Sequence, residues 1–198
     1  ESFRYTDVSS TYKANRQVDN QQNRAPTGLM SLKKLFVDKH PDKAFLWKEW
    51  EADDIVVAKK YYWPDKYLLC ALDKDVLWSL EGEHFNYYSS TQYKIDMKFF
   101  TCDADTAMKH HYKQTLTGDS ADGIVGLHRV GAKTADKLLA HCTTEEECWE
   151  TVVEEYEKRG RTIIDAITNI RLVSMNQLVL QEDNTFKVVL WQPKYRIA

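Results

Sequence analysis

Apolar residues along the chain follow two patterns, which predict alternating strands and helices. Short continuous apolar runs at 44–47 and 67–72 have the length of buried strands, and a further strand is predicted at 85–88. Apolar residues spaced three or four apart indicate amphipathic helices. The helices predicted in this way cover 28–39, 51–61, 104–116, 119–123, 133–141, 144–158 and 161–180, and short strands are also predicted at 93–95 and 188–191.

The order strand, acidic residues, helix occurs twice within residues 44–78. This order is typical of an α/β fold in which helices flank a parallel-rich central sheet. From residue 103 onward the pattern is mainly helical. We therefore expect an α/β domain over residues 1–100, followed by a helical region over 101–198.

Acidic residues recur in three groups along this pattern. The groups are Glu51, Asp53 and Asp54; Asp73 and Asp75; and Asp119 and Asp122. An acidic first turn on a helix is by itself an ordinary capping pattern, because the helix dipole favours negative charge there. In parallel sheets, however, ligands sit at the carboxyl ends of the strands, so the first two groups should meet at one edge. Their recurrence favours a metal site over a structural role.

A glycine-containing loop follows the third acid group. Gly126 and Gly131 enclose an apolar residue, Val130, and a helix is predicted to begin near Lys133 and Thr134. Glycines allow close approach of a phosphate, and a helix N-terminus presents N–H donors to it. This pattern predicts a helix–hairpin–helix over residues 118–141 that grips a DNA backbone without reading its sequence.

Composition narrows these hypotheses only slightly. The 198-residue chain carries a formal net charge of −3, so no overall basic character indicates nucleic acid, although active-site acids would offset basic patches. The four cysteines show no Cys-x-x-Cys spacing, which favours free thiols in a reducing, cytoplasmic compartment over a zinc site. No apolar run approaches the 18 or so residues of a membrane span, so we expect no membrane partner.

Five motifs together resemble a known family. In chain order they are Tyr12–Arg16, Glu51–Asp54, Asp73–Asp75, Gly118–Asp122 and Val130–Thr134. They resemble the flap endonuclease and 5′-3′ exonuclease family, most of all the exonucleases of short-tailed (podovirus) phages. The resemblance spans nearly the whole chain, and it extends to the C-terminal segments 170–173 and 189–193.

This resemblance implies a PIN-like 5′ nuclease fold and hydrolysis of DNA phosphodiesters with two Mg²⁺ or Mn²⁺ ions. It implies that the ions lie closest to Glu51, Asp53, Asp73 and Asp75, while Asp54, Asp119 and Asp122 hold metal-bound waters. Lys13 and Arg16 would neutralise charge on the scissile phosphate, at the foot of a basic arch segment over 1–35. The substrates implied are double-stranded or branched DNA with 5′ ends, in a bacterial host cell if the protein is encoded by a phage.

Further contacts with DNA are expected outside the acid groups. Arg4 is a candidate phosphate contact in the N-terminal segment. In the hairpin, DNA-binding residues are expected at Gly126, Val130, Gly131, Lys133 and Thr134, and the resemblance implies a K⁺ site formed by backbone carbonyls of the first three. His110 and His111 are interpreted as residues of a helix surface or of the rim of the DNA site.

The chain departs from the family pattern at its start. The family's first strand carries a metal-binding Asp, and a second Asp precedes the position of Phe3, but Glu1 begins this sequence. We expect either a longer enzyme or a separate N-terminal polypeptide that completes the sheet, and little nuclease activity from residues 1–198 alone. The alternatives are a non-catalytic protein that binds branched DNA through the hairpin, and a purely structural acidic α/β domain.

Overall fold

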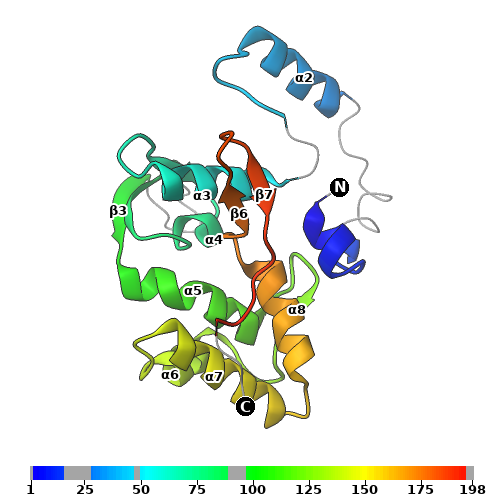
Figure 1. Cartoon of the computed structure of the whole chain (residues 1–198), viewed down its shortest axis with the longest axis vertical. Helices are drawn as coiled ribbons and strands as arrows, with labels where there is room; N and C mark the ends of the chain where they lie inside the picture. The colour runs from blue at the N-terminus through cyan, green and yellow to red at the C-terminus, as the bar shows by residue number, and fades with distance from the viewer. Residues whose placement is uncertain (1, 16–27, 47–49, 89–96, 195–198) are drawn as a thin grey trace.

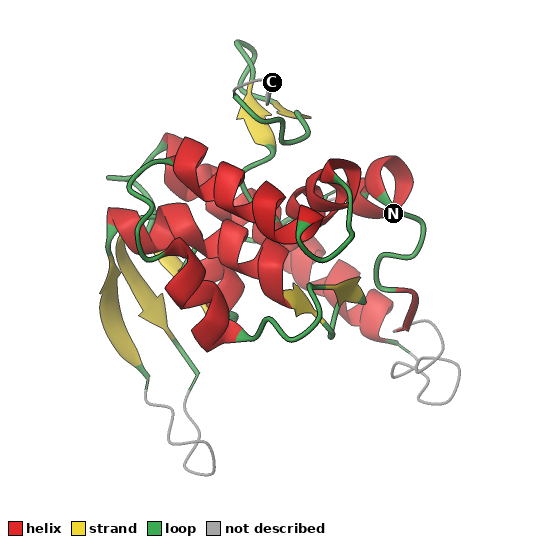
Figure 2. Cartoon of the chain, turned by 90° about the horizontal axis from the view of Figure 1, so that it is seen from below, coloured by secondary structure: helices red, strands yellow, loops and turns green. Residues whose placement is uncertain are grey.

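The computed structural model describes residues 2–15, 28–46, 50–88 and 97–194, which form a mixed α/β structure (Figure 1). Apart from the helix Leu29–Lys39, which projects from the rest of the chain (Figure 1), its helices gather in one cluster (Figure 2). The elements in chain order are η1 (Arg4–Val8, a π-helical turn), α2 (Leu29–Lys39), α3 (Ala52–Tyr62), β1 (Leu69–Ala71), α4 (Lys74–Leu77), β2 (Gly82–Asn86), β3 (Lys98–Cys102), α5 (Ala104–Thr117), β4 (Gly118–Asp119), β5 (Ile124–Val125), α6 (Ala132–Leu139), α7 (Glu145–Glu157), α8 (Ile163–Val173), β6 (Leu178–Leu180) and β7 (Phe186–Val188).

The main sheet is small and mixed. Its order is β1-β2-β3, with β1 parallel to β2 and β2 antiparallel to β3. The α/β class is therefore confirmed, whereas the prediction of a parallel-rich sheet holds for one strand pair only. The helices α3 and α4 contact β1 and bury Val57 and Val76 against Leu69. This packing places the start of α3 beside the end of β1.

The strand predicted at 44–47 is wrong as far as the structure describes it. Residues 44–46 have no regular structure, and Phe45 and Leu46 are exposed. A run of four apolar residues has too little periodicity to identify a strand, and residues 44–46 belong to none of the described strands. Residue 47 and the strand predicted at 93–95 lie outside the described residues.

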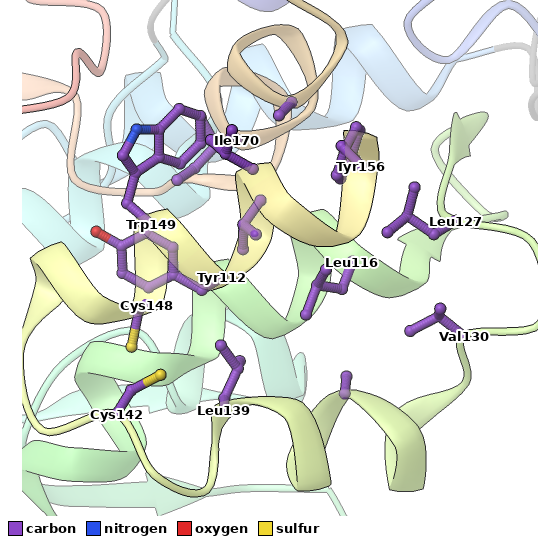
Figure 3. Packing of buried hydrophobic residues seen from close by; sticks show 14 residues of the cluster. Tyr112, Leu116, Leu127, Val130, Leu139, Cys142, Cys148, Trp149, Tyr156 and Ile170 are labelled. Carbon is purple, nitrogen blue, oxygen red and sulfur yellow. The ribbon is translucent and has the colours of Figure 1, made fainter. Parts of the chain in front are cut away.

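The helical half has one continuous core. Side chains from α5, α7 and α8 converge in it, including Tyr112, Leu116, Trp149, Tyr156 and Ile170 (Figure 3). Helices α7 and α8 each begin with a capping box, at Thr144 and Thr162, in which the threonine hydroxyl and an acid three residues later satisfy free N–H groups. This core holds α5 rigidly along its length.

The helix predicted over 161–180 is too long, because α8 ends at Val173 and β6 follows. The buried side chain of Gln177 donates to the carbonyls of Arg171 and Ser174, and its Oε1 accepts from the N–H of Trp191. A helix through this position would lose these bonds. The strand predicted at 188–191 lies earlier, as β7, which pairs antiparallel with β6.

The helix predicted over 119–123 is also wrong, since residue 119 ends β4 and residues 120–123 form the turn to β5. Gly118, with φ of +70°, and Gly126 bring two backbone segments together. A Cβ on Gly118 would lie 2.2 Å from the amide nitrogen of Gly126, and one on Gly126 would lie 2.1 Å from the carbonyl carbon of Thr117. Only glycine permits this approach, so the two residues fix a hairpin.

Helix α2 forms as predicted but does not bury its apolar side. Met30, Leu32 and Phe36 are 70%, 62% and 58% exposed, and the helix projects from the rest of the chain (Figure 1). Across the described ranges, no helix is both long enough and apolar enough to cross a membrane.

Candidate metal centre

The three acid groups line one pocket. Its volume is about 320 Å³, and we call it the acid pocket. The start of α3, the turn from β1 to α4 and the β4–β5 hairpin each contribute carboxylates. The charged residues that line it are Lys13, Glu51, Asp53, Asp73, Lys74, Asp75, Asp119 and Asp122. Six of the seven predicted metal-site acids are thus brought together, including the two from the hairpin that had been expected on a helix.

The carboxylates line the pocket without meeting at a point. Among the residues that the structure describes, no three His, Cys, Asp or Glu side chains are close enough to form a ready-made metal cluster. Mg²⁺ usually keeps several of its waters, so carboxylates around it need not all touch the ion. The donor set, which consists of oxygen atoms, is the type that Mg²⁺ and Mn²⁺ prefer.

The charge balance in the pocket favours a cation near Asp53. Burial raises the pKa of Asp53, and repulsion from Asp73 and Glu51 raises it further. A divalent ion would reverse this repulsion, because opposite charge favours the ionised carboxylate.

Local structure positions Asp73 and Asp75. Asp73 is the N-cap of α4, and its Oδ1 accepts a hydrogen bond of 2.8 Å from the backbone N–H of Asp75. This cap turns the chain so that Asp75 enters the first helical turn and becomes buried. Its Oδ1 atom has no hydrogen-bond partner in the described part of the chain.

Tyr12 and Lys13 join the first and third acid groups. Lys13 Nζ donates to Glu51 Oε2 over 2.7 Å and lies 3.6 Å from Asp122 Oδ2, while Tyr12 Oη donates to Asp122 Oδ2 over 3.1 Å. Lys13 has φ of +55°, and its backbone N–H donates to the carbonyl of Asp122. Burial alone would raise the pKa of Glu51, but the hydrogen bond from Lys13 and its charge hold that pKa below its usual value.

Asp54 and Arg4 bind each other inside the protein. Arg4 donates to both carboxylate oxygens of Asp54, over 2.7 and 2.6 Å, and to the backbone carbonyls of Leu172 and Ser174. Both side chains are completely buried. Because the guanidinium is enclosed, Arg4 is not accessible to DNA in this structure, and the predicted contact stays a prediction. Asp54 does not line the acid pocket, and its role in holding metal-bound water also stays a prediction.

Burial and pairing act in opposite directions on the Arg4–Asp54 pair. Burial favours the neutral form of each group, and it raises the pKa of Asp54. For Arg4 the carboxylate outweighs burial, so the pKa of the guanidinium lies above its usual value. A guanidinium does not lose its proton in proteins, which keeps a positive charge beside Asp54.

The hairpin residues fall into two sets. Gly131, Lys133 and Thr134 are exposed at the start of α6, where Gly131 is an N-cap without a side-chain acceptor, so no N-cap side chain bonds the first-turn N–H groups. Val130 is buried in the helical core, and Gly126 faces the backbone of Thr117 and Gly118. The K⁺ site, which was predicted at the backbone carbonyls of Gly126, Val130 and Gly131, stays a prediction. Arg16, the second predicted phosphate contact, lies outside the described residues.

The pattern alone did not identify two further residues at the pocket. Gln114 on α5 lines the acid pocket, and His110, one turn earlier, lies 3.5 Å from Asp75 Oδ1. His110 had been interpreted as a residue of a helix surface or of a DNA rim. The spacing of four residues places both on one face of a helix, but the sequence does not show what that face meets.

A scan against protein-family models and searches of curated proteins and of solved structures find no match to the chain.

Proposed function

We propose that the chain is a metal-dependent 5′-3′ exonuclease or flap endonuclease that hydrolyses DNA phosphodiesters, or the larger portion of such an enzyme. The observation that carries the proposal is the acid pocket, where carboxylates from three separate segments converge beside Lys13. Converging acids repel each other and are costly unless cations occupy the space between them. Two bound divalent ions would supply a nucleophile at neutral pH and stabilise the attacking and leaving oxygens of the phosphate.

Within this proposal the fit of the metal rests on two features of the pocket. The first is the raised pKa of Asp53, to which burial and then repulsion from Asp73 contribute. The second is the buried Asp75 Oδ1, which has no hydrogen-bond partner among the described residues. Asp53, Asp73 and Asp75 would hold the ions, with Glu51, Asp119 and Asp122 further out.

Lys13 would act on the substrate rather than on the ions. Its side chain retains 25% exposure, and its Nζ is held by one short bond to Glu51. A phosphate that entered the pocket would compete for this ammonium group and be partly neutralised by it. Arg16 would act in the same way from the segment next to it.

The start of α6 would hold the DNA backbone outside the acid pocket. Its first-turn N–H groups lack a side-chain cap, and Lys133 and Thr134 are exposed beside them. Helix N-termini of this kind bind phosphates without reading sequence. Lys133→Ala should therefore weaken DNA binding and reduce the slope of log affinity against log salt by about 1, because one phosphate contact releases about one counterion.

A separate N-terminal polypeptide belongs to the same proposal. Strand β1 pairs on one side only, with β2, among the described strands. Its other edge offers backbone donors and acceptors to which a further strand could be added. Such a strand would lie next to the carboxyl end of β1, beside the acid pocket.

The test uses a 5′-labelled flap DNA, with Mg²⁺, with Mn²⁺ or with a chelator, and compares the wild-type protein with Asp73→Asn. Asparagine is as good an N-cap as aspartate, so this substitution removes the charge and preserves the start of α4. We expect metal-dependent release of short 5′ products from the wild type, and loss of this release in the variant with unchanged DNA binding. Equal cleavage by the two proteins would contradict the proposal.

A non-catalytic protein that binds branched DNA is the second candidate. It is favoured by the lack of a ready-made metal cluster among the described residues. Metal binding separates the two functions even if cleavage requires another polypeptide. Divalent-ion binding that Asp73→Asn abolishes supports the nuclease, whereas tight binding of flap DNA without any such ion binding supports the second candidate.

A further inference from the structure

Asp75 and His110 face each other at the edge of the acid pocket. His110 Nε2 lies 3.5 Å from Asp75 Oδ1, and Asp75 lies on α4 while His110 lies on α5. Both atoms are buried, and neither makes a hydrogen bond within the described part of the chain. They are two of only four such side-chain atoms found there, so the pair is unusual in this molecule.

Two buried polar atoms without partners are costly, at about 1–3 kcal/mol each. A hydrogen bond between the two atoms would remove this cost. An N–H···O bond forms at a donor–acceptor distance of about 2.7–3.2 Å, which is shorter than the present separation. Closing the gap requires a movement of about 0.5 Å. The arrangement is therefore one small adjustment away from an Nε2–H···Oδ1 hydrogen bond.

The direction of the pKa shift at Asp75 agrees with a hydrogen bond from His110. Burial by itself would raise the pKa of Asp75, but the side chains of His110, Lys74 and Gln114 together outweigh burial, so that pKa lies below its usual value. Lys74 Nζ is 3.9 Å from Asp75 Oδ1, and its side chain is 79% exposed, so this contact is weak. His110, whose side chain is only 14% exposed, is the enclosed donor.

The position of Asp75 links its contact with His110 to the acid pocket. Asp75 lines the acid pocket and also a neighbouring pocket of about 710 Å³, which His110 lines and which residues of α4, α5 and α6 enclose. The side chain of Gln114, which lines the acid pocket, also bonds to the Asp75 carboxylate, so a bond from His110 to Oδ1 would fix the orientation of this carboxylate at the pocket from a second side. Because the helical core fixes α5, His110 is a rigid support for this carboxylate.

We propose that His110 is a positioning residue, which holds the Asp75 carboxylate through Oδ1 and thereby sets the affinity of the acid pocket for divalent cations. This inference rests on the proposed function, and it names a residue that acts through another residue rather than on the ion. Hydrogen-bond partners of metal-ligating groups typically change metal affinity by about 10–100-fold.

The experiment measures Mn²⁺ affinity by the electron paramagnetic resonance signal of the free ion, in wild type, His110→Leu and His110→Gln. Leucine removes the donor, whereas the glutamine amide can replace Nε2–H. We expect binding to weaken by about 10–100-fold in His110→Leu and by less than about threefold in His110→Gln. Lys113→Met is the matched control on the same helix, and it should change the affinity by less than about threefold because Lys113 does not line the acid pocket and pairs with Asp136 instead.

A second background tests the route through Asp75. The double variant Asp75→Asn/His110→Leu should bind Mn²⁺ only slightly more weakly than Asp75→Asn alone. An undiminished further loss would show that His110 does not act through Asp75. If wild type binds Mn²⁺ and His110→Leu binds it equally well, the role of His110 is overturned while the proposed function stands. If wild type shows no Mn²⁺ binding that depends on Asp73, both are overturned.

Discussion

Glu51 and Asp54 lie one helical turn apart at the start of α3, yet they meet their cations in different ways. Asp54 accepts two hydrogen bonds from Arg4, and neither side chain is exposed to solvent. Glu51 accepts one short bond from Lys13, and the two side chains retain 19% and 25% exposure at the acid pocket. We call the first the sealed pair and the second the open pair.

The difference separates a structural role from a functional one within one motif. The sealed pair ties η1 to α3, and through the carbonyls of Leu172 and Ser174 it also ties η1 to the end of α8. Four N–H···O bonds hold the Arg4 guanidinium, and it is completely buried, so it is not accessible to a ligand. The open pair leaves an ammonium group at the pocket with one short partner. Under the proposed function, an incoming phosphate would replace that partner.

The largest expected effect comes from breaking the sealed pair. Arg4→Met leaves the Asp54 carboxylate buried without its partner, and we expect the free energy of unfolding to fall by about 3–5 kcal/mol. Urea denaturation measures this loss. The double variant Arg4→Met/Asp54→Leu removes both charges and should recover much of it. A loss below about 1 kcal/mol in Arg4→Met would show that the pair is not structural.

Breaking the open pair should cost much less. Lys13→Met removes a partly exposed cation, and we expect the free energy of unfolding to change by about 1 kcal/mol or less. The folded pKa of Glu51 is lowered, so its pairing stabilises the wild type above the unfolded pKa of about 4.3 and is lost as pH falls through the folded value. Lys13→Met should flatten this acid-side loss in urea titrations. An unchanged pH profile would contradict the assignment.

The smallest expected effect is a gain in stability from Asp53→Asn. The folded pKa of Asp53 is raised, so below the unfolded pKa of about 3.9 the group costs nothing, and the cost grows as pH rises toward the folded value. The variant should therefore be more stable than the metal-free wild type near neutral pH, by less than about 1 kcal/mol because solvent screens the group.

Asp53→Asn should also lose part of the stabilisation that Mg²⁺ gives to the wild type. Mg²⁺ should raise the melting temperature of the wild type by mass action and have a smaller effect on Asp53→Asn. Thermal melts with and without Mg²⁺ measure both effects. A variant that is less stable than the metal-free wild type, or that gains as much from Mg²⁺, would rule out repulsion among these acids.

Local patterns predicted the parts of the site that local structure builds. The acids after β1 and at the start of α3 converge because a strand and the helices packed on it fix where their ends lie. The spacing of Asp119 and Asp122 fits a helix and a hairpin turn equally well, and the contact between Gly118 and Gly126 decided for the hairpin.

Contacts between residues far apart in the sequence could not be predicted from the pattern of apolar and polar residues. Arg4 meets Asp54 and Leu172 across 50 and 168 residues, and no periodicity reports such a pairing. The same holds for His110, whose partner depends on how α5 packs against α4. The end of α8 depends on Gln177 and on Trp191, 14 residues further along the chain.

The most direct test of the acid pocket as a metal site is an anomalous difference map from crystals soaked in Mn²⁺. We expect one peak, or two peaks about 3.5–4 Å apart, among the carboxylates of Asp53, Asp73 and Asp75. A map with no peak in the acid pocket at saturating Mn²⁺, or with peaks only elsewhere on the protein, would contradict the proposed metal centre.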